Sequence, residues 1–130
     1  MLGEQIFCFE EGRFVYYKML RDGKWEDTEE YKGTFVGEES ILTLTAEGDF
    51  YPDGTGYAEL WGVFTTKGGS RCRFKGIGSL TINPDGPNSW RGALLLASLS
   101  NGLSRLNGKI VIFEGEWDDS FLRLKGWEWK

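Results

Sequence analysis

The chain has 130 residues, twenty acidic and fifteen basic side chains, a net charge of −5 and no histidine. This length predicts a single domain over residues 1–130 and argues against a two-domain enzyme. The acidic balance disfavours a nucleic-acid or anionic-membrane partner that needs a basic face. The lack of histidine excludes Ser-His-Asp and Cys-His catalysis and imidazole metal sites, and the sequence indicates no metal and no cofactor.

The expected location is the cytoplasm. Residues 1–5 lack the basic region and apolar core of a secretory signal. The longest nearly apolar run, residues 93–99, is far shorter than the ~20 residues that cross a bilayer, so no membrane partner is expected. Cys8 and Cys72 have no framework spacing and are predicted to be reduced, buried thiols.

Short stretches rich in β-branched and aromatic residues, separated by turn signals, predict an all-β chain. In chain order, the predicted strands cover residues 5–9, 13–20, 31–36, 40–46, 55–66, 71–80, 90–97, 106–117 and 121–129. Turns are predicted at residues 10–12, 22–23, 37–39, 52–54, 67–69 and 83–87. The stretch 98–105 is predicted to be a loop or a short turn of helix, because the Asn-Gly pair in it opposes a longer helix.

Side-chain alternation on the predicted strands indicates which face of each strand lies inside. The predicted inward residues are Ala58, Leu60, Gly62 and Phe64, then Cys72, Phe74, Gly76, Gly78 and Leu80, then Val111, Phe113, Gly115 and Trp117. Glycines that alternate with large residues are typical of a small closed barrel, so we expect one antiparallel β-barrel of about eight to nine strands. The opposite faces carry Tyr57, Trp61, Ile110 and Ile112, which predicts a homo-oligomer.

Six segments within residues 62–130 resemble an uncharacterised family of bacterial and archaeal proteins. The segments are residues 62–69, 74–78, 90–93, 103–108, 111–118 and 127–130. Their glycine-spaced strands are also similar, more distantly, to the calycin-like barrels of the allene oxide cyclase and dirigent group. The distant resemblance implies a β-barrel, an oligomer and a hydrophobic ligand cavity. No catalytic residue of that group matches a position in this chain.

Several side chains suggest chemistry but have a simpler explanation. Glu114 and Glu116 share one strand face and could supply an acid and a base, although a solvated or interface face is the favoured interpretation. Asp53 and the pair 118–119 lack the spacing of a calcium loop and are predicted to be turn residues. Tryptophans could line a ligand pocket, with packing favoured for any single one; the six are Trp25, Trp61, Trp90, Trp117, Trp127 and Trp129.

Two functional hypotheses follow. The first is a barrel that binds a hydrophobic small molecule, with Phe64, Phe74, Phe113 and Trp117 on the walls. The second is a cofactor-independent cyclase or isomerase, in which an apolar cavity shapes the substrate and one carboxylate or tyrosine hydroxyl moves protons. A cavity of about 300 Å³ or more with a convergent carboxylate would favour the enzyme. An apolar cavity of that size without an ionisable group would favour the binding protein. A filled core would leave an oligomeric interaction or scaffold protein.

Overall fold

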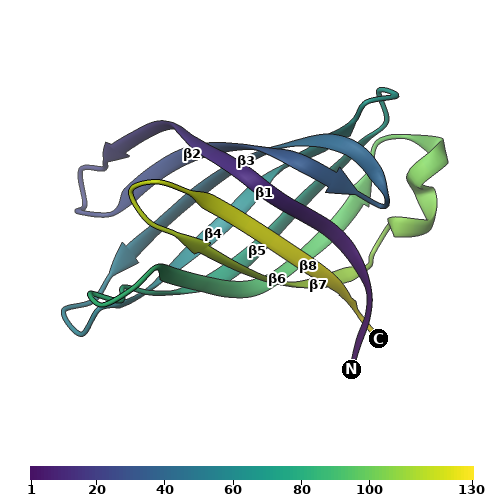
Figure 1. Cartoon of the computed structure of the whole chain (residues 1–130). Helices are drawn as coiled ribbons and strands as arrows, with labels where there is room; N and C mark the ends of the chain where they lie inside the picture. The colour runs from purple at the N-terminus through teal and green to yellow at the C-terminus, as the bar shows by residue number, and fades with distance from the viewer.

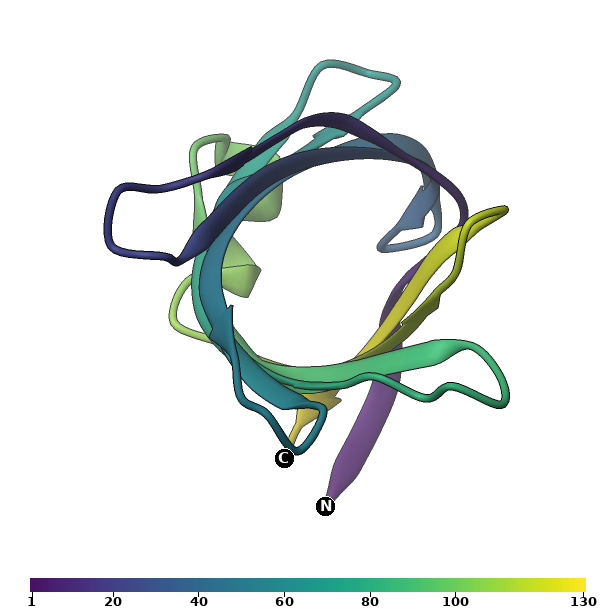
Figure 2. The same cartoon turned by 90° about the vertical axis from the view of Figure 1, so that its left-hand side faces the viewer.

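The computed structural model describes residues 1–130 and is one closed barrel of eight antiparallel strands (Figure 1). The strands are β1 (Leu2–Met19), β2 (Trp25–Phe35), β3 (Glu38–Phe50), β4 (Thr55–Thr66), β5 (Arg71–Thr81), β6 (Asn88–Ser98), β7 (Ile110–Trp117) and β8 (Leu122–Trp129). Each strand pairs with the next along the chain, and β8 pairs with β1 to close the ring (Figure 2). The sequence-based prediction of a single antiparallel β-barrel is therefore confirmed. The fold has no helix with the length and apolar character needed to cross a membrane.

The hairpin turn predicted at residues 10–12 is wrong, because the first two predicted strands form the single strand β1. Two register shifts against β2, after Phe9 and after Phe14, bend this strand without reversing it. Gly12 allows close packing inside the barrel, since a Cβ there would lie 2.5 Å from Cδ2 of Tyr31. The glycine is therefore required by the neighbouring tyrosine ring and not by a turn.

The pairing of β1 is uneven along its length. Its first half pairs with both neighbours, and the last pair with β8 joins Phe9 to Leu124. Beyond that point, residues 11–19 pair with β2 alone. The β1–β2 hairpin therefore projects past the start of β8 with one unpaired edge.

The strand predicted to begin at residue 31 begins at Trp25. Five of the six odd-numbered positions of β2 are buried, beginning with its first residue, and none of the even-numbered positions is. The high density of acidic residues at both kinds of position hides this alternation in the sequence. The prediction therefore missed the half of β2 that carries carboxylates into the interior.

The two ends of the barrel are built from different connections. The closed end holds both chain termini, the turns 36–37 and 67–70, and the short helix η1 (Asn101–Leu106), whose Leu103 and Leu106 are buried in the core (Figure 1). The expectation of a loop or short helix over residues 98–105 is confirmed. The open end, which faces the viewer in Figure 2, holds the loops 20–24, 51–54, 82–87 and 118–121.

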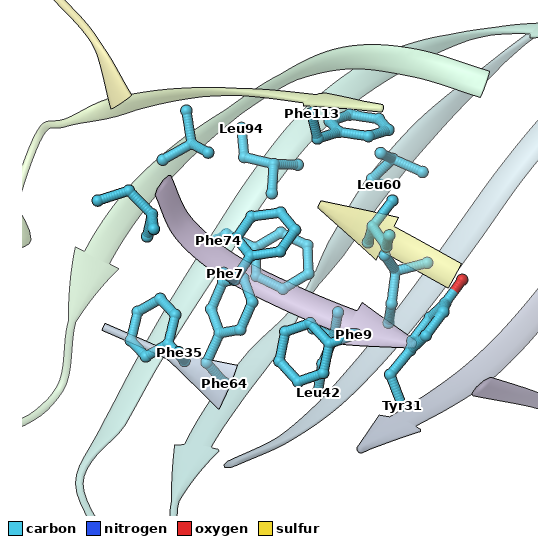
Figure 3. Packing of buried hydrophobic residues seen from close by; sticks show 14 of the residues in the cluster. Phe7, Phe9, Tyr31, Phe35, Leu42, Leu60, Phe64, Phe74, Leu94 and Phe113 are labelled. Atoms are coloured by element: carbon cyan, nitrogen blue, oxygen red, sulfur yellow. The ribbon is translucent and has the colours of Figure 1, made fainter. Parts of the chain in front are cut away.

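Aromatic rings fill the barrel interior toward the closed end (Figure 3). Phe35 and Phe64 stack with ring centroids 4.2 Å apart, and Phe64 also lies 5.2 Å from Phe7 and 5.0 Å from Phe74. The inward faces predicted for β4, β5 and β7 agree with the observed burial along those strands. Both cysteines are free thiols, with Cys72 buried and Cys8 only partly covered.

Candidate functional site

The open end of the barrel contains a cavity of about 330 Å³. Nine of its eleven lining residues are hydrophobic, and the other two are the carboxylates Asp27 and Glu29. The hydrophobic residues are Phe14, Tyr17, Trp25, Ala46, Phe50, Leu80, Trp90, Trp117 and Leu122. A mostly apolar hollow with a few convergent polar groups is the usual composition of a small-molecule site.

One wall of this region is formed by four successive inward residues of β2. Trp25, Asp27, Glu29 and Tyr31 are 7%, 6%, 5% and 0% exposed. Because inward side chains recur at every second residue, they form a row with a spacing of about 6–7 Å. The strand thus holds two neighbouring carboxyl groups inside the barrel, between a tryptophan and a tyrosine.

Tyr31 lies at the boundary between the packed interior and the cavity. Its ring packs near Phe9, with centroids 6.2 Å apart, and its hydroxyl oxygen points away from the phenylalanine rings (Figure 3). The hydroxyl donates a hydrogen bond of 2.5 Å to Oε1 of Glu29. Glu29 is therefore supported from the core side, while Asp27 lies nearer the open end.

Burial raises the pKa of both carboxyl groups. For Glu29, burial is the largest cause and holds the pKa well above its usual range. The charge of Asp27 raises the pKa of Glu29 further. The pKa of Asp27 rises to about 6, chiefly because of burial. The pKa of Tyr31 is raised by burial and by the adjacent Glu29. Because the side chains of Asp27 and Glu29 also hydrogen-bond to each other, the two groups titrate together, and a proton on the pair is held more strongly by Glu29 than by Asp27.

Two buried polar atoms beside the cavity have no hydrogen-bond partner in the protein. They are Nε1 of Trp25, a donor, and Oδ1 of Asp27, an acceptor. Leaving such a group unpaired costs roughly 1–3 kcal/mol. The Trp25 ring itself is held by Phe50, with centroids 5.6 Å apart and an interplanar angle of 26°. The wall beside the cavity therefore contains one unused donor and one unused acceptor.

The four side chains predicted to form a ligand wall lie in two regions. Trp117 lines the cavity. Phe64, Phe74 and Phe113 are 0%, 4% and 1% exposed and belong to the packed core. Among the tryptophans, Trp25 and Trp90 also line the cavity, whereas Trp61, Trp127 and Trp129 do not.

Asp27, Glu29 and Tyr31 were not among the predicted site residues. A sequence signal for them exists, because a strand placed directly after the turn at residues 22–23 puts Trp25, Asp27, Glu29 and Tyr31 on one face. An aromatic pair that encloses two acids on one strand face indicates buried carboxylates.

The acidic residues that the sequence offered for catalysis have structural roles. Glu116 accepts a 2.6 Å hydrogen bond from Arg123, and Glu114 lies in register between Arg91 and Lys125. This arrangement supports the interpretation of a charged outer face. Carboxylates in the loops stabilise turns, since Asp53 accepts hydrogen bonds from Thr55, and Asp118 from Ser120 and Phe121.

The fold and the cavity together define a closed eight-stranded barrel with a hollow at one end. The sequence matches no protein-family model and no curated protein. In structure, the chain is similar to a conserved protein of unknown function from Rhodopseudomonas palustris, with a TM-score of 0.69, 11% identity and coverage of 99% of this chain and 98% of that one. It is also similar to a protein of unknown function from Clostridium acetobutylicum, with a TM-score of 0.75, 11% identity and 98% coverage of both chains. Identities this low show a shared fold alone.

Proposed function

We propose that the protein binds a small hydrophobic molecule in the cavity at the open end. The observation that carries the proposal is an apolar hollow of about 330 Å³ beside two unpartnered polar atoms, Trp25 Nε1 and Asp27 Oδ1. Burial of apolar surface contributes about 25 cal/mol per Å² to binding, and the two polar atoms give the ligand an orientation. The resemblance to calycin-like barrels, which implies a hydrophobic ligand cavity, points the same way.

The proposed ligand lies nearer the open end than the sequence alone suggests. The ligand is surrounded by Trp25, Trp90 and Trp117. It does not reach deeper, because Phe64 and Phe74 already occupy the interior near the closed end. The ligand therefore rests against the packed core and does not pass through the barrel.

A dye-binding experiment with a matched pair of variants tests this proposal. N-phenyl-1-naphthylamine, an uncharged dye that fluoresces in apolar surroundings, is titrated into the wild type, Ala46→Phe and Ala93→Phe. Ala46 lines the cavity, whereas Ala93 lies on the outer wall. We expect Ala46→Phe to abolish binding by filling the space, and Ala93→Phe to bind as the wild type does. Equal binding by both variants, or no binding by the wild type, would contradict the proposal.

The cavity and its two carboxylates also meet the condition stated above for a second candidate, a cofactor-independent isomerase or cyclase. It is favoured by the juxtaposition of Asp27 with Glu29, a carboxyl group whose pKa lies further above its usual range and which accepts a hydrogen bond from Tyr31. An ionised carboxylate in an apolar site serves as a base, and a protonated neighbour serves as an acid. Deuterium incorporation next to the carbonyl of 4-phenylbutan-2-one, followed by NMR, distinguishes this function from binding alone. Acceleration that Asp27→Asn removes supports the enzyme, and a rate equal to that in buffer opposes it.

A further inference from the structure

We propose that the ligand of the open-end cavity is an organic cation, an ammonium group carried on an apolar body, held between the Asp27 carboxylate and the aromatic wall. This inference rests on the binding function proposed above and names the chemical class of its ligand. Three independent observations support it: the uncompensated carboxylate, the aromatic composition of the wall and the charge of the surrounding loops.

The first observation is that no basic side chain compensates Asp27. No lysine or arginine lines the cavity. Lys24, the basic residue nearest to Asp27 in the chain, is directed elsewhere, since its Nζ lies 4.0 Å from Asp22. Asp27 is 6% exposed and its Oδ1 has no partner. A buried carboxylate without a counter-charge is costly, and an ammonium group supplies both the charge and a hydrogen-bond donor.

The second observation is that aromatic side chains dominate the wall. They are Phe14, Tyr17, Trp25, Phe50, Trp90 and Trp117. The faces of aromatic rings carry partial negative charge and attract cations, most strongly in tryptophan. An anionic ligand would meet these rings and a carboxylate together, and a neutral apolar ligand would leave Oδ1 of Asp27 without a partner. The wall therefore favours a cation over both alternatives.

The third observation is the charge of the four loops around the opening, residues 20–24, 51–54, 82–87 and 118–121. They contain five aspartates and only two basic residues, Arg21 and Lys24. The connections at the closed end, residues 36–37, 67–70 and 99–109, contain three basic residues and no acid. Such an asymmetry raises the local concentration of cations at the open end, where the cavity lies.

The test compares three probes that share one apolar body. Isothermal titration calorimetry at about pH 8, above the range in which Asp27 titrates, measures binding of 4-phenylbutylammonium, 4-phenylbutanol and 5-phenylpentanoate to the wild type. We expect the ammonium to bind about tenfold more tightly than the alcohol, and the carboxylate to bind most weakly. Added salt should weaken only the ammonium, because screening acts on charge.

The outcomes separate this inference from the proposed function. If the alcohol or the carboxylate binds as tightly as the ammonium, the ligand class is wrong, although hydrophobic binding stands. If none of the three binds, both proposals fall. This ranking uses the wild type alone and is decisive even if a variant fails to fold.

The variant Asp27→Asn locates the preference within the site. It should remove the advantage of the ammonium over the alcohol, so that the two affinities measured on this variant differ by less than about twofold. Asp85→Asn, in an open-end loop, removes an equal charge from outside the cavity and should change ammonium affinity by less than about twofold, since exposed charges are screened. An ammonium preference that survives Asp27→Asn would overturn the assignment.

Discussion

The same strand, β2, carries Phe35 into the closed end of the barrel and Asp27 into the open end. At the closed end, Phe35 stacks on Phe64 at 4.2 Å and the interior is filled. At the open end, equivalent inward positions hold a carboxylate and a tryptophan beside a cavity of about 330 Å³. The difference shows that one continuous ladder of backbone hydrogen bonds supports both regions, and that the inward side chains determine which region stabilises the fold and which can bind.

The sharpest way to test this division is to truncate one ring at each end. Phe64→Ala should lower the free energy of unfolding by about 3–5 kcal/mol, because it leaves a void among packed rings. Trp117→Ala, at a half-buried wall position, should cost less than about 1.5 kcal/mol, since the space beside it is already open. Urea denaturation measures both. A similar cost for the two variants would mean that the open end is as tightly packed as the closed end.

The pH dependence of stability tests the buried carboxylates of the open end. The folded-state pKa of Asp27 is raised from 3.8 to about 6, so its contribution to stability is present at acid pH and is lost as pH rises through about 6. Asp27→Asn should therefore gain stability relative to the wild type between about pH 4 and pH 8, by on the order of 2 kcal/mol. Denaturation at both pH values measures the gain. Glu114→Gln, on the outer face, serves as the control, and an equal gain there would contradict the assignment.

A smaller loss of stability should follow from displacing Tyr31, whose hydroxyl hydrogen-bonds to Glu29. A Cβ added at Gly12 would collide with the Tyr31 ring, so Gly12→Ala should cost about 1–2 kcal/mol and weaken the hydrogen bond to Glu29. The matched control is Gly102→Ala in η1, where a Cβ would meet no atom within 4 Å. Thermal unfolding compares the two. If Gly12→Ala is as stable as Gly102→Ala, the tyrosine ring is not held against β1.

Substitutions on the outer wall of the barrel should change the free energy of unfolding least. Self-association through this wall is a prediction from the sequence. An apolar groove there is lined by Trp61, Ile77, Leu95 and Ile110. If the homo-oligomer predicted from sequence forms through this wall, Ile110→Lys combined with Ile112→Lys should give a smaller species in sedimentation velocity. Dye binding and the β-sheet circular dichroism should not change, because neither substituted residue lines the open-end cavity. A wild type that sediments as a monomer would contradict the predicted oligomer.

The parts of the fold that the sequence predicts are those with a clean period of two. On β5, basic residues alternate with Cys72 and Phe74, so the inward face is evident. The same logic fails on β2, where Glu26 and Asp27 are adjacent acids with opposite orientations. Gly12 misleads for another reason, because a glycine needed for ring packing looks in sequence like one needed for a turn. The cavity depends on the register of all eight strands, which no local pattern contains.

The unpaired edge of β1 has a kinetic consequence. Residues 11–19 pair with β2 alone, and Phe14 and Tyr17 of this segment line the cavity at 48% and 59% exposure. Amides on its free edge should exchange with deuterated solvent much faster than those facing β2. A hairpin held along one side opens locally at far lower free energy than the whole barrel unfolds. The rate of this local opening would then set the residence time of a bound molecule, independently of how tightly the closed end is packed.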